Sequence, residues 1–266
     1  MDVESRRRSG GAVLAAIAAS LVVIVAVSVP ARAQLEVGVY EGVPWPIIAP
    51  PLGLPIPAPP RPTPAEPATP AAARVIEVLR GVQTSMRQTR YQHATVVRER
   101  EGVFLWDCSG MAAWVLRRAA PRAMSAITRE RPVARDFVSA IERAPARGGR
   151  SGWQRIEHID AVRPGDVFAW RRPRGFPSRN TGHVGFVMEA PVPLPSIPGA
   201  YAVRIADSTS WGHQEDTRRD DGVGGFGFGT LVFLTDGQGH ATHYGWVGTL
   251  SDGYVITPIV FGRPLR

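Results

Sequence analysis

The sequence predicts an α+β protein in which an antiparallel sheet is covered by helices on one side. Two observations lead to this prediction. Between residues 72 and 143, apolar residues recur every three or four positions, which is the period of a helix. From residue 166 onward, short runs of β-branched and aromatic residues alternate with Gly, Pro and Asp, the pattern of strands and turns. Helices followed by strands indicate the α+β class.

The first 33 residues have the features of a secretory signal peptide. A positive segment at residues 6–8 precedes an uncharged apolar run at residues 12–29, and a small-x-small cleavage site ends at Ala33. Cleavage after Ala33 predicts export to the periplasm, the cell envelope or the medium. The alternative is an uncleaved membrane anchor, because a spanning helix needs about 17–25 apolar residues. Contact with a membrane would then be confined to this segment.

Residues 34–70 are predicted to form a linker, since prolines crowd the stretch from Pro44 to Pro70. Proline fixes φ and has no backbone N–H, so neither a helix nor a central strand is expected there. A semi-rigid, polyproline-II-like spacer fits this composition. It is either a tether that holds the domain away from a membrane or wall, or a passive leader. The folded domain is predicted to cover residues 71–266.

Within this domain, the periodicities place the elements as follows. Helices are predicted over residues 72–87, 107–120 and 133–143. The second helix is expected to stop at Pro121. Strands are predicted over residues 166–170, 183–188, 202–206, 230–234, 242–250 and 253–259.

The charge of the chain argues against a nucleic-acid partner. The formal net charge is +8, and all 31 basic residues are arginine. A uniform choice of arginine is explained more simply by the base composition of the gene than by a binding role. No basic stripe is interleaved with aromatic residues, so no nucleic acid is expected. A positively charged exported protein is, however, attracted to anionic polymers of the envelope.

Cys108 is the single cysteine of the sequence, which excludes an internal disulfide. It stands at the start of the second predicted helix, within Asp107-Cys108-Ser109-Gly110. Unpaired N–H groups and the dipole at a helix N-terminus stabilise a thiolate, and Asp107 or Ser109 can cap the same turn. A buried structural cysteine is the alternative, but it does not explain this position. The pattern therefore favours a nucleophile.

A histidine at the start of a predicted strand can serve as the base for this thiol. Gly182 and Gly185 flank His183 and leave its imidazole room to face a helix N-terminus. The next strand ends at Asp207, whose carboxylate can accept the imidazole N–H and fix its tautomer. His213, in a polar cluster just beyond that strand, is the alternative for this third residue.

Three motifs in this order resemble the NlpC/P60 superfamily of papain-like enzymes. They are Asp-Cys-Ser-Gly at a helix start, Pro-Gly-Asp (residues 164–166) before a strand, and Gly-His-Val-Gly (residues 182–185) on the next strand. The resemblance covers residues 91–234. It implies a circularly permuted papain-like fold, a Cys-His-polar triad and cleavage of amide bonds, typically in cell-wall peptides.

The resemblance also implies roles for individual residues. Cys108 is the nucleophile, His183 the base and Asp207 the orienting residue, and Tyr91 matches a tyrosine that helps to bind the oxyanion. The residues predicted to lie on the substrate side of the site are Tyr91, Asp107, Ser109 and His213.

The sequence therefore predicts an exported cysteine hydrolase that acts on a cell-wall peptide or glycopeptide. Acyl transfer to an amine through the same thioester, and a silent module that binds glycan or peptide, are the alternatives. No metal and no cofactor are expected. His240 and His243 have no third ligand nearby, and the glycine-rich residues 222–227 precede a strand where a dinucleotide site needs a helix. The glycine-rich stretch is interpreted as a flexible loop.

Overall fold

The computed structural model describes residues 47–48, 64–176, 178–219, 222–251 and 253–266, which belong to one compact unit, Gly42–Arg266. The predicted signal peptide and most of the predicted linker lie outside the described residues. Within them, most helices precede the main run of antiparallel strands, so the α+β class is confirmed. No helix in this part of the chain is long and apolar enough to cross a bilayer.

The helices lie close to their predicted positions. They are α1 (Pro70–Ser85), α2 (Cys108–Ala119), α3 (Pro121–Ser125) and α4 (Ala134–Glu142). α1 begins before the predicted residue 72 because the Thr69 hydroxyl accepts the N–H of Ala72 at 3.0 Å. Pro70 then occupies the first position, where no N–H is needed. Pro121 follows the end of α2, as predicted, but it also begins α3, which was not predicted.

The strands form two sheets. They are β1 (Ile47–Ile48), β2 (Gln88–Tyr91), β3 (Val96–Arg98), β4 (Val103–Trp106), β5 (Trp153–Ile156), β6 (Val167–Arg171), β7 (Gly182–Val187), β8 (Val192–Pro193), β9 (Ala200–Thr209), β10 (Gly225–Thr235), β11 (Ala241–Gly245), β12 (Tyr254–Ile256) and β13 (Ile259–Pro264). The large sheet has the order β1-β12-β11-β10-β9-β7-β6-β13-β5, with β8 paired to β9, and its strands pair antiparallel. The small sheet has the order β2-β4-β3.

Two strand predictions and one loop prediction need correction. The strand predicted over 242–250 ends at Gly245, and a 3-10 helix follows at Gly248–Leu250. The strand predicted over 253–259 is divided into β12 and β13, since Pro258, between them, has no N–H to donate to a strand ladder. The loop predicted at 222–227 is wrong in its second half, because β10 begins at Gly225 and pairs with β9.

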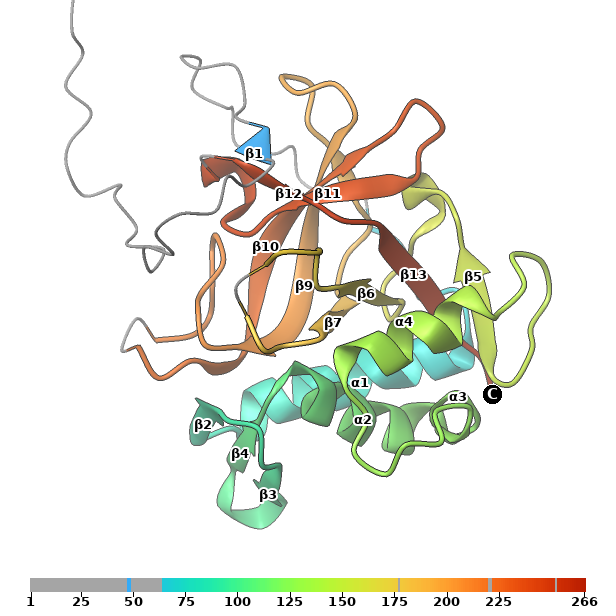
Figure 1. Cartoon of the computed structure of the whole chain (residues 1–266). Coiled ribbons are helices and arrows are strands. Elements are labelled where there is room, and N and C mark those ends of the chain that lie inside the picture. The colour runs from blue at the N-terminus through green and yellow to red at the C-terminus, as the bar shows by residue number, and fades with distance from the viewer. Residues whose placement is uncertain (1–46, 49–63, 177, 220–221, 252) are drawn as a thin grey trace, which may run out of the picture. The chain divides into compact units, whose positions relative to one another are not determined.

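The helices pack against one face of the large sheet (Figure 1). α2 contacts β7 and β9, α4 contacts β5, β6, β7 and β13, and α1 contacts α2 and β13. The core between these layers includes Leu79, Met111, Leu116, Phe137 and Phe186. This packing brings the N-terminal end of α2 to the strands β7 and β9.

The large sheet is strongly curved. β11 contacts β13 although the two strands are not neighbours in the strand order. The enclosed face holds a second apolar cluster that includes Phe168, Phe233 and Phe261. Because both faces of the central strands are packed, those strands are rigid supports for polar side chains at their ends.

The Pro-Gly-Asp segment builds the turn before β6. Gly165 has φ +85°, and a Cβ there would lie 2.3 Å from the Ala72 carbonyl oxygen, so the turn needs glycine. Asp166 is buried and accepts hydrogen bonds from the Arg163 N–H at 2.9 Å and from the Arg263 guanidinium at 2.9 and 2.8 Å. The segment therefore fixes α1 and β13 to the sheet.

Candidate active site

Cys108 is the first residue of α2, and its neighbours hold the helix start in place. The Asp107 carboxylate accepts the N–H of Gly110 at 2.7 Å and the Ser109 hydroxyl at 2.9 Å. A side chain at position 110 would clash, since its Cβ would lie 2.3 Å from the Thr95 hydroxyl. Cys108 is a free thiol with 7% of its surface exposed. The predicted capping residues are thus used by the helix itself, and Ser109 is buried beneath the turn.

His183 lies opposite this thiol on β7. Its Nε2 approaches the Asp207 carboxylate at 2.7 Å, which leaves Nδ1 as the ring nitrogen available to the nearby Cys108. The rings of Trp170 and Trp246 border the imidazole, with centroid distances of 5.0 and 5.2 Å. The structure thus brings together the three residues predicted from the sequence as nucleophile, base and orienting residue.

The protonation of His183 follows from this environment. Burial lowers its pKa, but the negative charge of Cys108 and the hydrogen bonds with Asp207 and Cys108 outweigh this and raise the pKa from 6.5 to about 9. At neutral pH the imidazole is therefore protonated. A protonated imidazole beside a thiol places a proton donor next to a candidate nucleophile.

Asp207 is fully buried near the end of β9 and receives three polar side chains. His183 and His213 both approach the same oxygen, Oδ2, at 2.7 and 2.8 Å, and Arg218 bonds the other oxygen, Oδ1. Burial alone would raise the pKa of Asp207, but the positive charges of His213 and Arg218 hold it well below its usual value. The carboxylate therefore stays ionised and acts as an acceptor.

His213 does not line a cleft. Its side chain is completely buried and contacts Asp207, which separates it from His183 and Cys108. The prediction that His213 lies on the substrate side of the site is therefore corrected. The two alternatives for the third residue are joined in the structure. Asp207 contacts His183 directly, and His213 contacts Asp207.

Tyr91 lies close enough to Cys108 for the two to interact electrostatically. It ends β2, where it is paired with Trp106, and a hydrogen bond joins its hydroxyl to the Asn180 side chain. Burial raises the pKa of Tyr91, and the negative charges of Cys108, Asp107 and Asp207 raise it further. The phenol therefore keeps its proton and can donate a hydrogen bond near the sulfur.

Several residues at the site were not predicted. His93 is exposed, and its Nδ1 lies 3.2 Å from Asp107. Asn180 and Trp246 come from a loop and from the end of β11, and neither has a distinctive spacing in the sequence. Arg218 lies in the loop between β9 and β10, and its bond with Asp207 was not predicted. The fold of this loop against β9 and β10 places it there.

Among the described residues, no group of three or more His, Cys, Asp or Glu side chains is arranged to hold a metal ion. His240 contacts Asp236 at 3.0 Å, and His243 contacts the neighbouring Thr242 hydroxyl at 2.8 Å. The two histidines thus contact different partners and not a common point. The side chains of Asp107, Asp207 and His183 already hydrogen-bond other protein groups.

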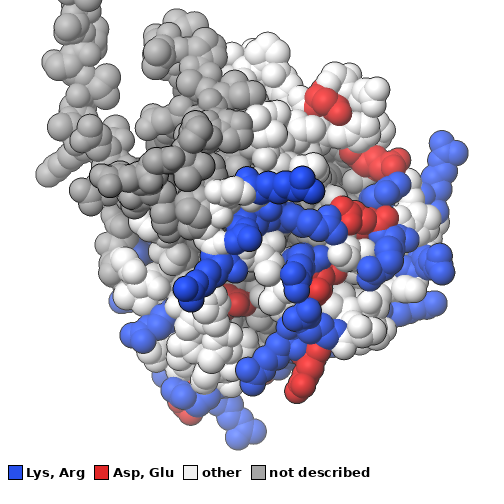
Figure 2. All heavy atoms as spheres, in the orientation of Figure 1, with Lys and Arg blue, Asp and Glu red and all other residues white. Residues whose placement is uncertain are grey.

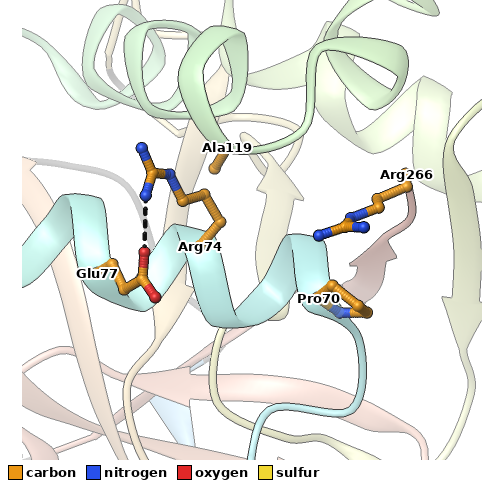
Figure 3. Close-up of a pocket in the computed structure, with 5 residues that line it drawn as sticks. All are labelled: Pro70, Arg74, Glu77, Ala119 and Arg266. Carbon is orange, nitrogen blue, oxygen red and sulfur yellow. Dashed lines mark hydrogen bonds and ion pairs between the residues drawn. The ribbon is translucent and has the colours of Figure 1, made fainter.

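A hollow of about 390 Å³ lies away from the thiol (Figure 3). It is bordered by α1, by the C-terminal end of α2 and by the last residue, Arg266. Its lining residues are Pro70, Arg74, Glu77, Ala119 and Arg266. Arg74 and Glu77 pair with each other at 2.9 Å across exposed surface. Ala119 ends the helix that Cys108 begins, about 16 Å away at 1.5 Å per residue. The hollow is separate from the candidate active site.

Comparison with known proteins does not assign a family. No family model matches the chain, and no solved structure matches it. An uncharacterized protein of Acanthamoeba polyphaga mimivirus is 28% identical over 205 residues, which cover 66% of this chain and 88% of that protein. The function is therefore argued from the geometry of the site.

Proposed function

We propose that this chain is a cysteine hydrolase of the papain-like, NlpC/P60-related kind that cleaves amide bonds. One observation carries the proposal: an unbroken series of contacts from Cys108 through His183 to Asp207. A thiol at a helix N-terminus, an imidazole that bonds it and an acceptor behind the imidazole are the parts that a cysteine nucleophile needs. A purely structural cysteine needs none of them.

The arrangement of elements supports the papain-like fold that the motifs imply. That fold places the nucleophile at a helix start and packs the helix on an antiparallel sheet. Here α2 packs on β7 and β9, the two neighbouring strands that carry His183 and Asp207. The order Cys, His, Asp along the chain follows the order of the motifs.

In the proposed first step, the Cys108 thiolate attacks the carbonyl carbon of the scissile amide. The new C–S bond converts the carbonyl oxygen to an oxyanion. The backbone N–H of Cys108, which has no acceptor within its helix, and the Tyr91 hydroxyl are the donors placed to stabilise it. His183 gives its Nδ1 proton to the nitrogen, the C–N bond breaks, and an amine leaves a thioester on Cys108.

In the second step, neutral His183 takes a proton from water, and the resulting hydroxide attacks the thioester. The C–S bond breaks and releases a carboxylic acid and the thiolate, which pairs again with protonated His183. In both steps the Asp207 carboxylate accepts the hydrogen bond from His183 Nε2 and keeps the imidazole facing the sulfur. Acyl transfer differs only in that an amine takes the place of water.

The surface beside the site supports an anionic substrate such as a cell-wall peptide with free carboxylates. The loop between β6 and β7 carries Arg172, Arg174 and Arg179, all exposed and without an ion pair among the described residues. Asn180, next in this loop, contacts Tyr91 beside the thiol. Figure 2 shows arginines spread over the face on which this loop lies. Export would bring the protein to such polymers.

The proposal is tested by incubating the purified protein with muropeptides and identifying products by mass spectrometry. Wild type should release a peptide with a new free amine, and Cys108→Ala should release none. With an excess of an added amine, a conjugated product would indicate transfer in place of hydrolysis. Binding of muropeptides without any product, unchanged in Cys108→Ala, would replace the enzyme proposal with a binding module.

A further inference from the structure

Asp207 contacts two histidines, His183 and His213, which differ in the group that faces Nδ1. His183 bonds Asp207 through Nε2 and faces Cys108 with Nδ1. His213 bonds the same oxygen through Nε2, but its Nδ1 faces the carbonyl oxygen of Trp246 at 3.0 Å. A carbonyl and a carboxylate both accept hydrogen bonds, so both ring nitrogens of His213 must donate. The geometry thus fits an imidazolium.

Arg218 completes a buried group in which the charges balance. It bonds Asp207 Oδ1 and Asp216, and its Nε donates to the Gly225 carbonyl at 2.7 Å. Its side chain is 3% exposed, and that of Asp207 is fully buried. The two carboxylates of Asp207 and Asp216 are thus matched by Arg218 and by protonated His213. Buried charges are stable only when paired in this way.

The glycines of β10 supply the space for these cations. A Cβ at Gly227 would lie 2.6 Å from Arg218 Cγ, and one at Gly229 would lie 2.7 Å from His213 Cβ. Gly227 is also the residue directly opposite Asp207 in the strand pair. The Gly-Phe-Gly-Phe-Gly pattern therefore places the small residues on the face of Arg218 and His213, while Phe226 joins the core.

We propose that His213 and Arg218 are positioning residues, which hold Asp207 ionised and fixed so that one of its oxygens stays on His183 Nε2. His183 then keeps Nδ1 on Cys108. This inference rests on the proposed function and deepens it, since it adds two residues to a site described by three. The ionisable groups that face Asp207 are His183 from β7, Tyr91 from β2, and His213 and Arg218 from the segment before β10. Cys108 from α2 lies beyond His183.

The test is the pH profile of Cys108 alkylation by iodoacetamide in the full chain, for Arg218→Gln, Arg218→Lys and His213→Gln. Without the Arg218 charge, an Asp207 that takes up a proton no longer stabilises the His183 imidazolium, and an Asp207 that stays ionised makes the field at the thiolate more negative. Either outcome moves the half-maximal alkylation rate to higher pH, by about 1–2 pH units in Arg218→Gln. Arg218→Lys should recover most of that shift, and His213→Gln should show a smaller one.

Arg219→Gln is the matched control, because Arg219 is the adjacent, exposed arginine. Its profile should match wild type. A folded Arg218→Gln protein with the wild-type profile, or an Arg218→Lys profile shifted as far as Arg218→Gln, would overturn the inference. If Arg218→Gln does not fold, the alkylation profiles of His213→Gln and of Gly229→Ala, which displaces His213, replace it. Wild-type profiles in both of these variants would overturn the inference. Alkylation of Cys108 needs no substrate. If the protein did not hydrolyse amides, the proposed function would fail, but the alkylation profiles would still test the roles of Arg218 and His213.

Discussion

Two histidine–aspartate clusters in the large sheet have similar contact distances but different surroundings. In the turn between β10 and β11, His240 lies 3.0 Å from Asp236. In the candidate site, His183 lies 2.7 Å from Asp207. The Asp236 side chain is 41% exposed, and its other contacts are the backbone N–H groups of residues 238 and 240. Asp207 is fully buried and contacts two further cationic side chains.

The difference shows that burial, and not the contact itself, gives such a pair chemical consequences. The pKa of Asp236 is lowered mainly by the backbone N–H of His240, and water screens the rest. At Asp207, no water offsets an unpaired charge, so the surrounding cations are obligatory and the effect reaches His183 and Cys108. The first pair closes a turn, and the second can support catalysis.

Removal of the imidazole in each cluster should give the largest contrast. We expect His183→Ala to lower the rate of amide hydrolysis by about 10³-fold or more, because the thiolate loses its partner and the leaving amine its proton donor. His240→Ala should hydrolyse at the wild-type rate. Both are measured with muropeptides under identical conditions, with circular dichroism to confirm folding. Equal rates in the two variants would remove His183 from the mechanism.

Changing each carboxylate to its amide separates support from chemistry. Asp207→Asn removes the carboxylate that buried His213 and Arg218 share, although Arg218 keeps its ion pair with Asp216. The loss should lower the free energy of unfolding by about 3–5 kcal/mol, measured by urea denaturation. Its activity should fall less than that of His183→Ala, since an amide oxygen still accepts the imidazole N–H.

The same position also tests which residue orients His183. If Asp207→Ala were silent while His213→Ala abolished activity, His213 would be the third residue. The structure leads us to expect the opposite order, because Asp207 contacts His183 and His213 does not.

The pKa shifts of Asp207 and His183 also predict how stability depends on pH. The pKa of His183 is raised from 6.5 to about 9, so its stabilising contribution is complete below pH 6.5 and is lost as the pH rises through about 9. The pKa of Asp207 is lowered, so its contribution is present above pH 3.8 and is lost only at much lower pH. Urea midpoints from pH 6 to 10 should therefore decline in wild type. In His183→Gln this decline should be absent, and its persistence there would assign it to another group.

The nucleophile side of the site could be predicted from the sequence because its interactions are local. Asp107, Cys108, Ser109 and Gly110 are consecutive, and their roles at a helix start follow from residue type and position. The α+β class and most long strands were predicted for the same reason, since each has its own periodicity.

The support behind the base could not be predicted in this way. Gly227 lies opposite Asp207 through the register of β9 and β10, and Arg218 reaches Asp207 from the loop between these strands. No local sequence pattern specifies either placement. The small sheet was missed because its strands are short, and β2 alternates only between exposed and half-buried residues. Tyr91 was therefore found by motif alone, without the strand that positions it.

The smallest effect on stability is expected at Asp236, and its dependence on salt provides the contrast with Asp207. Asp236→Asn keeps an oxygen that can accept the N–H groups of residues 238 and 240, and it loses only the charge that faces His240. Exposed ion pairs contribute little because water competes for both partners. We expect a slight fall in the urea midpoint at low ionic strength and none in 1 M salt, where the screening length is about 3 Å. The loss in Asp207→Asn should persist in 1 M salt, since ions do not reach a fully buried carboxylate. Equal sensitivity to salt at the two positions would show that Asp207 is open to solvent, and the distinction between the two clusters would then fail.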